Sequence, residues 1–490
     1  MRTATIVIRD EVNIKLEGLE LDMRQRLVKQ FKYDVPYARY LPAVRLGRWD
    51  GKVSYFQLGG STYTNLLPEI IPVLEQYNYN IELDDQRDYS TPTFAFDLVE
   101  ENRWAYKSWP KGHPAAGEPV MLRDYQVEIV NNFLQNPQCI QEVATGAGKT
   151  IMTATLSASV EPYGRSIVIV PNKSLVTQTE KDYINLGLDV GVYFGDRKEH
   201  GHQHTICTWQ SLNVLLKNTK SGTADISIGE FIEGVVCVMV DEVHMAKADA
   251  LKTLLTGVMS RIPIRWGLTG TIPKEKFESQ SLLVSLGPVI GKLTANELQQ
   301  QGVLAQCHVN IVQLQDHVEY SNYQSELKYL LEESGRLDAM SALIQQVNET
   351  GNTLVLVDRT ECGRQLVERL GERAVFVSGA TKAKARQDEY DEVAESTDKI
   401  IVATYGVAAV GINIPRIFNL VLVEPGKSFV RVIQSIGRGI RKAEDKDFVQ
   451  IWDVTSTCKF AKRHLTKRKA YYREANYPFT QEKLEWMKIK

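Results

Sequence analysis

The chain has 490 residues, of which 43% are hydrophobic and 24% are charged, and its formal net charge at pH 7 is −2. This composition is ordinary for a soluble globular protein, and the length predicts roughly three or four domains. No run of about 18 apolar residues is present, so we expect no transmembrane helix. The opening stretch, MRTATIVIRDEVNIKLEG, lacks a long apolar core and a small-residue cleavage site, so a signal peptide is not expected either.

Six cysteines are spread along the chain without any C-x-x-C pair. A zinc site or a disulfide framework is therefore not expected, and the pattern fits a protein of a reducing cytoplasm.

The charges are unevenly distributed. Residues 24–52 hold eight Lys or Arg and two Asp, and residues 456–490 hold ten Lys or Arg and three Glu. Such clusters are either phosphate-binding surfaces or solvated helix faces, and charge alone slightly favours solvated faces.

The first 86 residues show short, mixed patterns that predict a small α+β domain. Apolar residues alternate with polar ones at Val12, Ile14 and Leu16, as in a half-buried strand. One face of the helix predicted next carries Met23, Leu27, Val28 and Phe31.

Further along the same domain, LGRWDGKVSY (residues 46–55) predicts a hairpin with a tight turn at Asp50–Gly51. LLPEIIPVLEQY predicts a second helix with one proline near its start and a less favourable one at Pro72. Residues 87–119 predict a linker, because KSWPKGHPAAGEPV, which begins in this segment, is rich in Pro and Gly.

From residue 120 the pattern becomes that of an α/β protein. Runs such as SIVIVP, GVVCVMVDE, TLVLVD and KIIVATY alternate with helix-like stretches. Near-continuous apolar strands of this kind are typical of parallel sheets covered by helices on both faces. The pattern occurs twice, which predicts two α/β domains at residues 120–300 and 336–455. A connecting segment at 301–335 and a basic C-terminal tail at 456–490 complete the chain.

The stretch IQEVATGAGKT predicts a phosphate-binding loop. Gly146 and Gly148 allow the backbone to turn tightly and to point its N–H groups at phosphates. Lys149 would reach the β- and γ-phosphates, Thr150 would hold Mg²⁺, and the following helix would favour an anion at its N-terminus. The strict pattern has glycine where this chain has Val143, and the alternative is a Gly-rich turn before a helix.

The stretch VVCVMVDEVH ends an apolar strand in Asp241 and Glu242. This places two carboxylates at the carboxyl edge of a parallel sheet, where ligands bind in open α/β folds. Asp241 is predicted to hold Mg²⁺, largely through water, and Glu242 to orient and deprotonate the attacking water. Surface acids that cap the next helix are the alternative, which the phosphate loop disfavours. His244 either couples this site to the next motif or simply packs.

Eight motifs occur in order within residues 120–455, and together they resemble the motif series of superfamily 2 helicases and translocases. They are LRDYQ, ATGAGKT, VPNKSLVTQ, TWQSL, DEVH, GLTGT, VATYGVAAVGINIP and QSIGRGIR. The resemblance implies an α/β fold with two tandem RecA-like parallel-sheet motor domains, ATP and Mg²⁺ as cofactors, and a small α+β accessory domain in front.

The resemblance also implies roles for individual residues. Arg123 and Gln126 would contact the adenine. The nucleotide would be bound by Thr145, Gly146, Ala147, Gly148, Lys149 and Thr150. The catalytic residues would be Lys149, Asp241, Glu242, Gln434, Arg438 and Arg441. Because the arginines lie on the second domain and a guanidinium takes γ-phosphate charge well, ATP is expected to draw the two domains together.

Three of these motifs resemble segments that contact the sugar-phosphate backbone of a nucleic-acid strand. Hydroxyl groups, backbone N–H groups and Lys suit this role because they read charge rather than base sequence. The representative residues are Pro171, Thr208, Gln210 and Thr404. Trp209 is expected in the core instead. Many relatives have Asp where this chain has Asn413, which puts a ribose contact there in doubt.

The flanking segments resemble one group within superfamily 2, the UvsW-type recombination helicases of T-even-like phages. The similarity rests on VRLGRWDGKVSYF, TNLLPEIIPVLEQYNYNIELD and the tail KFAKRHLTKRKAYYREANYPF. It implies a DNA helicase that unwinds and branch-migrates forks, Holliday junctions, D-loops and R-loops in phage recombination, replication and repair. Its partners would be branched, double- and single-stranded DNA and the RNA of R-loops, with no membrane. The working unit would be a monomer in the cytoplasm of the bacterial host.

Two alternatives within the superfamily stay open: an ATP-dependent RNA helicase, and a double-stranded DNA translocase of the restriction or repair type. A non-motor DNA-binding scaffold is disfavoured because Lys149, Asp241, Glu242 and Arg441 are intact.

In the accessory domain, Arg45, Arg48 and Lys52 are predicted to bind duplex phosphate, and Trp49 is expected to pack. The basic tail is either a further nucleic-acid contact or a helix packed on the second motor domain by its tyrosines. These tyrosines are Tyr471, Tyr472 and Tyr477.

Overall fold

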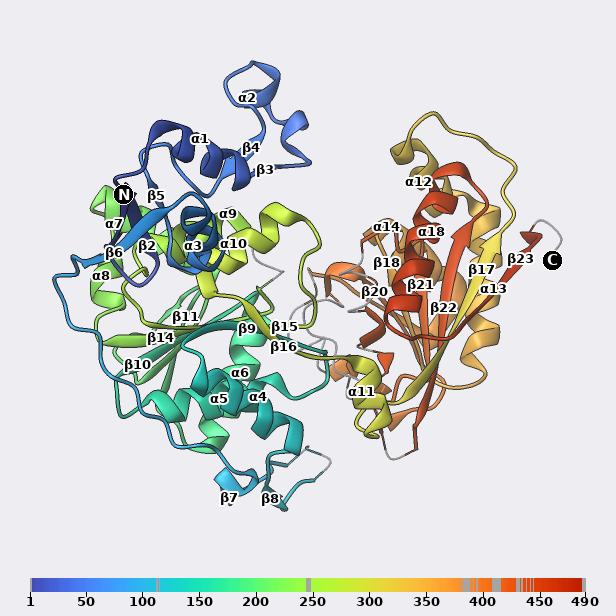
Figure 1. Ribbon diagram of the computed structural model, residues 1–490. Helices are drawn as coiled ribbons and strands as arrows, with labels where there is room; N and C mark the ends of the chain where they lie inside the picture. The colour runs from blue at the N-terminus through green and yellow to red at the C-terminus, as the bar shows by residue number, and fades with distance from the viewer. Residues whose placement is uncertain are drawn as a thin grey trace. The chain divides into compact units, whose positions relative to one another are not determined.

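The computed structural model describes residues 2–486 except 112, 114, 244–247, 380, 382–387, 391, 394, 408–415, 429–431, 433, 434, 438, 441 and 444. The chain forms two compact units, one of residues 1–143 and 148–292 and the other of residues 144–147 and 293–490 (Figure 1). No helix in this described part combines the length and the apolar character needed to cross a bilayer. All six cysteines are buried free thiols.

The N-terminal domain is a small α+β fold. Its sheet has the strand order β5-β2-β1-β6, in which only the β1–β6 pair is parallel. The strands are β1 (Arg2–Ile8), β2 (Asn13–Glu17), β5 (Ser61–Tyr63) and β6 (Tyr79–Asp85). Two helices pack on it, α1 (Leu21–Gln30) and α3 (Leu67–Gln76). Met23, Leu27 and Phe31 are buried, so the predicted apolar face of α1 is confirmed.

The segment around LGRWDGKVSY differs from the predicted hairpin. The tight turn is present at Asp50–Gly51, where Gly51 has φ +76° and the Asp50 carboxylate accepts from the backbone N–H of Lys52 at 3.1 Å. However, Leu46, Gly47 and Arg48, which precede the turn, form turns and a bend rather than a strand, directly after the short helix α2 (Pro42–Arg45). The strand after it, β4 (Lys52–Ser54), pairs instead with β3 (Lys32–Asp34). Pro42 at the start of α2 favours a helix there.

The first large sheet has the order β12-β11-β13-β10-β14-β15-β9-β16 and is parallel from β11 to β9. Its strands are β9 (Gln138–Val143), β10 (Arg165–Val170), β11 (Val190–Phe194), β12 (Arg197–Lys198), β13 (His204–Thr208), β14 (Val235–Asp241), β15 (Ile264–Thr269) and β16 (Val289–Leu293). The β-branched runs are buried on both faces, as the sequence predicted.

Helices cover both faces of this sheet (Figure 1). One face carries α4 (Asp124–Gln135), α5 (Lys149–Val160) and α6 (Lys173–Leu186). The other carries α7 (Trp209–Ser221), α8 (Ile228–Phe231), α9 (Ala248–Thr256) and α10 (Lys276–Leu286).

The second large sheet is parallel throughout, with the order β19-β20-β18-β21-β22-β17-β23. Its strands are β17 (Gln306–Leu314), β18 (Thr353–Val357), β19 (Ala374–Val377), β20 (Ile400–Thr404), β21 (Asn419–Val423), β22 (Phe448–Ser456) and β23 (Phe479–Leu484). The associated helices are α11 (Ala295–Gln300), α12 (Tyr323–Glu332), α13 (Ser334–Asn348), α14 (Thr360–Leu370) and α18 (Lys459–Glu474). The predicted fold class, two parallel-sheet domains behind a small α+β domain, is confirmed.

Three segments that the sequence placed outside the sheet domains contribute to them. In the predicted linker, β7 (Trp104–Ser108) pairs with β8 (Pro119–Val120), and Trp104 is buried with its indole N–H donating to the Thr155 hydroxyl at 2.9 Å. The predicted connecting segment contains β17, and the predicted tail contains α18 and β23. Strand pairing between such distant segments leaves no local signal, so periodicity could not reveal it.

The N-terminal domain is docked on α9 and α10. The Tyr55 hydroxyl donates to the carbonyl oxygen of Phe277 at 2.5 Å, and Val284 of α10 is buried within the apolar core of the N-terminal domain. The amide of Asn13 donates to the carbonyl oxygen of Thr256 at 2.9 Å. The ammonium group of Lys252 lies 4.5 Å from the centre of the Tyr55 ring. The N-terminal domain and the first sheet domain therefore fold as one unit.

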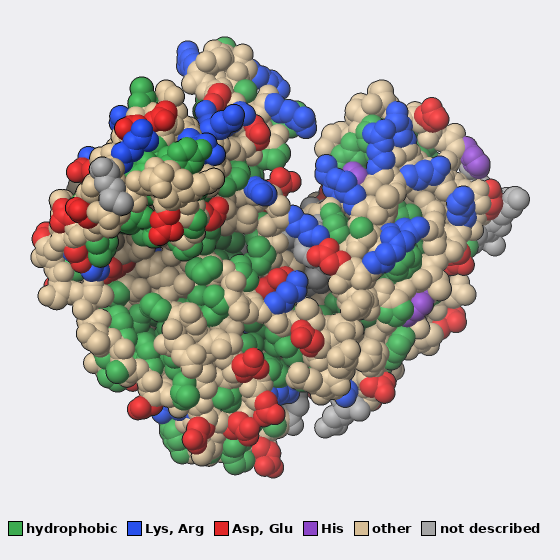
Figure 2. Space-filling view, viewed as in Figure 1, with side chains coloured by type: hydrophobic (Ala, Val, Ile, Leu, Met, Phe, Trp, Pro, Cys, Tyr) green, Lys and Arg blue, Asp and Glu red, His purple; other side chains and the backbone are tan. Residues whose placement is uncertain are grey.

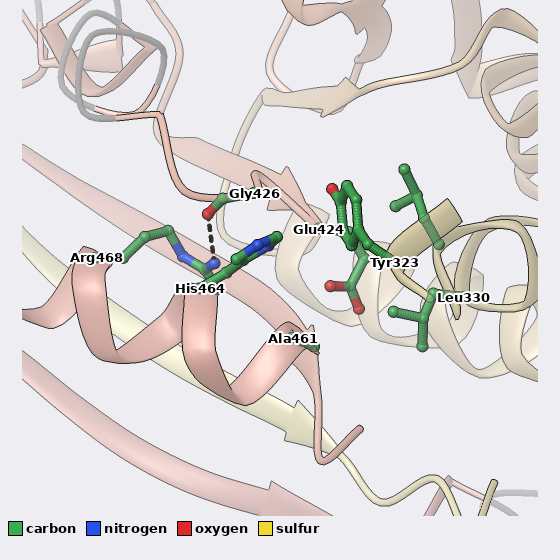
Figure 3. Close-up of a pocket in the computed structure, with 8 residues that line it drawn as sticks. Tyr323, Leu330, Glu424, Gly426, Ala461, His464 and Arg468 are labelled. Atoms are coloured by element: carbon green, nitrogen blue, oxygen red, sulfur yellow. Dashed lines mark hydrogen bonds between the residues drawn. The ribbon is translucent and has the colours of Figure 1, made fainter. Parts of the chain in front are cut away.

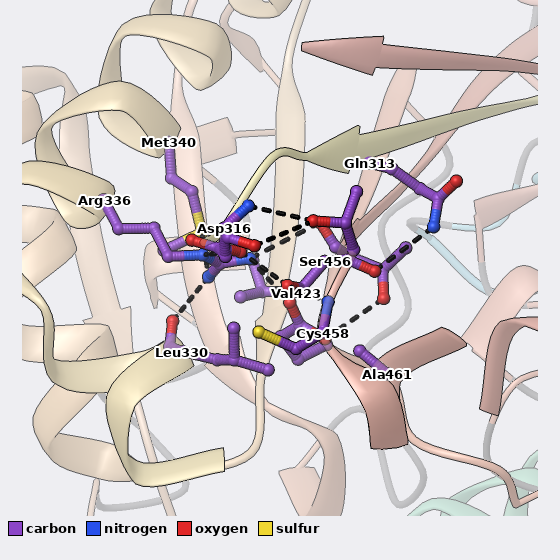
Figure 4. Close-up of polar contacts among 12 residues, drawn as sticks. Gln313, Asp316, Leu330, Arg336, Met340, Val423, Ser456, Cys458 and Ala461 are labelled. Atoms are coloured by element: carbon purple, nitrogen blue, oxygen red, sulfur yellow. Dashed lines mark hydrogen bonds and ion pairs between the residues drawn. The ribbon is translucent and has the colours of Figure 1, made fainter. Parts of the chain in front are cut away.

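A buried ionic network holds the second unit together (Figure 4). The guanidinium of Arg336, which is fully buried, pairs with Asp316 at 3.2 Å and with Glu424 at 2.7 Å. Asp316 also accepts from the hydroxyl of Ser456 and from the indole N–H of Trp486. Burial outweighs the attraction of Arg336 and raises the pKa of Glu424 to about 7. The network joins α13 to the ends of β17, β21 and β22.

Removing one member of this network is expected to be costly. Arg336→Met should destabilise the second unit by about 3–5 kcal/mol, because two buried carboxylates lose their cation. The matched control is Arg359→Met, which removes a half-buried arginine that pairs with Glu332 at 3.2 Å and should cost less than about 1 kcal/mol. Hydrogen exchange of peptides that cover β21 and β22 measures the difference. Equal protection in the two variants would contradict the structural role of the network.

Candidate nucleotide site

The phosphate loop connects β9 to α5. Gly146 has φ +93° and Gly148 has φ +81°, a left-handed conformation that residues with a Cβ rarely adopt. Gly148 is the N-cap of α5, so Lys149 and Thr150 begin the helix. The loop therefore presents backbone N–H groups and a helix N-terminus, the arrangement that binds phosphate in proteins.

Gln126 lies against this loop. A Cβ atom at position 148 would lie only 2.6 Å from the side-chain nitrogen of Gln126, and Gln126 is buried. Its side-chain oxygen accepts from the backbone N–H of Arg123 at 2.9 Å, and the Arg123 guanidinium donates to the hydroxyl of Tyr125 at 3.2 Å. Burial raises the pKa of Tyr125, which keeps the phenol protonated. The structure thus brings Arg123 and Gln126 to the phosphate loop.

Lys149 and Glu242 form the central ion pair of the site. The Lys149 ammonium lies 2.5 Å from Glu242 Oε1, and both side chains are more than nine-tenths buried. The second carboxylate oxygen of Glu242 accepts from the backbone N–H of Gly270 at 3.2 Å. Glu242 has φ +51°, an unusual conformation for a residue with a side chain. Such strain is maintained only where the surroundings fix the residue, and it is common at functional sites.

Two residues with oxygen donors suitable for Mg²⁺ directly adjoin the Lys149–Glu242 pair in the chain. Asp241 ends β14 directly before Glu242, and its Oδ1 accepts from the Glu242 N–H at 2.9 Å. Thr150 directly follows Lys149 in the first turn of α5. A carboxylate and a hydroxyl are hard ligands, and Mg²⁺ in nucleotide sites takes only one or two protein ligands beside phosphates and water. The donor set fits this ion.

Gly270 is a residue of this site that the sequence did not single out. Its N–H fixes the orientation of Glu242, and the next residue, Thr271, is held by hydrogen bonds to the hydroxyl of Thr269. The motif GLTGT, which contains Gly270, was the available sequence signal. The role of Gly270 could not be recognised from it, because the hydrogen bond comes from the backbone N–H and not from a side chain.

Several predicted residues lie outside the described part of the chain. They are His244, Asn413, Gln434, Arg438 and Arg441. Their predicted roles stay predictions.

The predicted strand-contacting residues of the first unit follow two adjacent strands. Pro171 follows β10, and its carbonyl oxygen accepts from the exposed side chain of Gln210 at 3.5 Å. Thr208, by contrast, is only 5% exposed, and its hydroxyl caps α7 by accepting from the N–H of Ser211. Trp209 packs against the core, as expected. In the second unit, Thr404 ends β20 and is half-buried.

In the N-terminal domain, the three predicted phosphate-binding residues have different surroundings. Arg45 and Arg48 are exposed at α2, and no ion pair is described for either of them. Lys52 pairs with Asp34 at 3.3 Å. Trp49 is half-buried against Val44 and Phe277, and its indole N–H donates to the carbonyl oxygen of Lys52 at 2.9 Å, so it packs as expected. Figure 2 shows Lys and Arg side chains where the domain carries α2.

Two family models match the chain. "Type III restriction enzyme, res subunit" matches residues 119–274, and "Helicase conserved C-terminal domain" matches residues 335–443. Among curated proteins, the ATP-dependent DNA helicase UvsW of Enterobacteria phage T4 is 23% identical over 90% of this chain and 88% of its own length. The DNA 3'-5' helicase XPB of Kineococcus radiotolerans is 24% identical over 73% of this chain and 64% of its own length.

Solved structures support the fold. A fragment of a putative HsdR subunit of a type I restriction enzyme from Vibrio vulnificus covers 96% of this chain and 85% of its own length, with a TM-score of 0.55 and 15% identity. Yeast Dbp5 bound to RNA and ADP BeF3 covers 74% of this chain and 90% of its own length, with a TM-score of 0.53 and 15% identity.

The geometry of the loop predicts that Gly148→Ala weakens nucleotide binding at least about tenfold. The new Cβ would have an unfavourable φ and would displace Gln126. Gly222→Ala is the matched control, because Gly222 has φ +71° at the end of α7 with open space around its Cβ. Titration with a fluorescent ATP analogue measures both variants. An equal loss in the two would show that backbone strain alone, and not the contact with Gln126, is responsible.

Proposed function

The chain belongs to the superfamily 2 helicases and is an ATP-dependent helicase of the UvsW type, and we propose that it unwinds and branch-migrates branched DNA. Its substrates would be forks, Holliday junctions, D-loops and R-loops in phage recombination, replication and repair. The observation that carries the proposal is the relative with which the chain shares nearly its whole length, a DNA helicase of phage T4. A working monomer in the cytoplasm of the bacterial host is part of the proposal.

Lys149 and Glu242 would exchange partners during ATP hydrolysis. The buried ammonium of Lys149 is balanced by the Glu242 carboxylate, and the negative charge of a triphosphate in the loop would attract it away. Glu242 would then be available to orient and deprotonate the attacking water, while the Gly270 N–H holds its other oxygen. This competition would couple nucleotide binding to the activation of the base.

The remaining residues of the ATP site have supporting roles in this proposal. Thr150 and Asp241 would hold Mg²⁺, which neutralises charge that develops on the phosphates. Arg123 and Gln126 would contact the adenine, and Thr145, Gly146, Ala147 and Gly148 would surround the phosphates. Gln434, Arg438 and Arg441 are proposed to complete the catalytic set.

The docked N-terminal domain would hold duplex DNA for the motor. Because Tyr55, Asn13 and Lys252 join this domain to α9 and α10, a force generated in the first motor domain would be transmitted to bound duplex. Arg45 and Arg48 at α2 are exposed to bind phosphates. Pro171, Gln210, Thr208 and Thr404 are proposed to follow the tracked strand, with Thr208 acting through the start of α7 that it caps.

The alternative function is that of an ATP-dependent RNA helicase. It is supported by the similar fold of yeast Dbp5, whose structure contains bound RNA. Comparing ATPase stimulation and unwinding on a fork, a Holliday junction, an R-loop, single-stranded DNA and RNA separates the two. We expect the branched DNA substrates to give the strongest stimulation. Stimulation by RNA alone would overturn the DNA proposal.

In the same assay, Lys149→Ala should lower ATP turnover by about 100-fold or more, because it removes the cation of the phosphate site. DNA binding should stay close to that of the wild type, since Lys149 is buried away from solvent. Lys217→Ala serves as the control, because Lys217 is an exposed lysine on α7 that lies outside the helicase motifs. Unchanged turnover in Lys149→Ala would refute the assignment of the site.

Replacing Arg45 and Arg48 by Gln should weaken junction binding about tenfold at low salt. The slope of log K against log salt should fall by the equivalent of about two phosphate contacts. Adding Lys52→Gln should change little further, because Lys52 is already paired with Asp34. Arg9 and Lys29, exposed elsewhere on the same domain, provide the control double substitution. Fluorescence anisotropy on a labelled junction measures all of these variants. If the two double variants bind the junction with equal affinity, α2 is not a DNA contact.

A further inference from the structure

The helix α18 has two faces of opposite character. Its inner face is buried through Ala461, Leu465, Arg468 and Tyr472. On this face the Arg468 guanidinium pairs with Asp453 of β22 through two contacts of 2.8 Å, and the Tyr472 hydroxyl donates to the same carboxylate at 2.6 Å. Arg468 also donates to the carbonyl oxygen of Gly426 at 2.8 Å (Figure 3). The helix is therefore fixed to the second sheet.

The tyrosines of the predicted tail take part in this packing. Tyr472 and Tyr477 are buried, and the hydroxyl of Tyr471 donates to the carbonyl oxygen of Lys427 at 3.0 Å. His464 turns into a small pocket beside Tyr323, with the ring centres 4.8 Å apart, and its burial lowers its pKa to about 4. The aromatic residues and the histidine thus account for packing, and they leave the outer face to lysines and arginines.

The outer face of α18 is a continuous cationic surface, which we call the α18 stripe. It consists of Lys459, Lys462, Arg463, Lys467 and Arg473, all of them exposed. At 100° per residue these five positions all point away from the buried face, and the only acid in the helix is Glu474. Among the described contacts none of the five forms an ion pair, although Arg463 and Arg473 lie over phenylalanine rings. Figure 2 shows Lys and Arg gathered over this helix.

The stability of the helix does not explain the stripe. Lys459, Lys462 and Arg463 lie in its first two turns, where the helix dipole is positive and acids would be favourable. Arg463 and Lys467 are like charges four positions apart, which is also destabilising. The N-terminal N–H groups are already satisfied, because Glu326 of α12 accepts from those of Phe460 and Ala461. The cations therefore add positive potential that the fold itself does not need.

The dimensions of the stripe match a nucleic-acid backbone. Lys459 and Arg473 are separated by about 21 Å along the axis at roughly 1.5 Å per residue. Over that length one strand of duplex DNA presents about six phosphates, at roughly 3.4 Å per phosphate. A membrane partner is disfavoured, because the apolar side of α18 is buried against β22 instead of being available for lipid.

We infer that the α18 stripe binds the phosphate backbone of a duplex arm, independently of base sequence, as a second anchoring surface on the second motor domain. The inference rests on the proposed function, in which the motor acts on branched DNA. It assigns a nucleic-acid role to residues outside the helicase motifs. Anchoring of a duplex here would let a junction keep one arm bound while the motor moves another.

The test compares two triple variants of the full-length protein. Lys459→Gln, Lys462→Gln and Lys467→Gln remove three charges from the stripe. Lys328→Gln, Arg364→Gln and Arg373→Gln remove three charges from other exposed positions of the same unit. Glutamine keeps a helix propensity close to that of lysine, so both variants should fold. A third variant with arginine at positions 459, 462 and 467 keeps the charge.

Binding to a forked DNA, a linear duplex DNA and a duplex RNA of the same sequence is measured by anisotropy at several salt concentrations. The stripe variant should lose about 10- to 100-fold in affinity for duplex DNA at low salt. The slope of log K against log salt should fall by nearly three, at about 0.9 per phosphate. The control triple should change the affinity less than about threefold, and the arginine variant should restore wild-type binding.

The outcomes separate this inference from the proposed function. If the stripe variant loses slope on duplex RNA and not on DNA, the surface binds phosphate but the DNA proposal fails. If the wild type prefers branched DNA while the stripe and control variants bind it equally, the DNA proposal stands and the stripe is not an anchor. Such a result would overturn the inference. The partner of the stripe would then be another polyanion, such as an acidic protein.

Discussion

The ion pair between Lys149 and Glu242 is the interaction on which the candidate site depends. It joins the helix that follows the phosphate loop to the end of β14, two segments separated by 93 positions in the chain. Without it, a buried ammonium and a buried carboxylate would each lack compensation, a cost of several kcal/mol. The parallel sheet makes the contact possible, because the carboxyl ends of β9, β15 and β14 lie at one edge. In the proposed function, a triphosphate that competes for Lys149 would therefore act on the ion pair that orients the proposed base, Glu242.

The second unit contains a similar pair of a carboxylate and a cation at the end of a central strand, but there other protein groups complete the contacts. β14 lies between β10 and β15, and β21 lies between β18 and β22. Glu242 and Glu424 directly follow β14 and β21, and both have positive φ, at +51° and +42°. Each pairs with a cation on the helix side of the sheet, Lys149 in the first unit and Arg336 in the second. In the second unit, however, Asp316, Ser456 and Thr455 complete the contacts, so the same corner stabilises the fold.

Two cationic surfaces lie outside the candidate nucleotide site, one at α2 and one on α18. α2 belongs to a domain whose core includes Val284 of the first motor domain, and α18 is held by the Arg468–Asp453 pair. On α18 the inner side chains anchor the helix while the outer arginines and lysines stay exposed, and at α2 Arg45 and Arg48 are exposed. In the proposed function such surfaces would restrain one DNA arm, because a motor can move one arm only if another is held.

The sequence by itself determined the local chemistry of this protein. The order of its motifs, the glycines of the phosphate loop and the apolar strands were all recognisable, because each depends on the conformation of a few adjacent residues. Tertiary structure decided the strand order, the placement of β17 and β23 in the second sheet, and the pairing of β4 with β3 instead of with the residues before Gly51. It also decided the partners of individual polar groups: Thr208 caps a helix, Lys52 meets Asp34, and Arg468 is buried while its neighbours on α18 are exposed. Periodicity shows which residues share a face, but which face is buried and which charge finds a partner depend on segments far away in the chain.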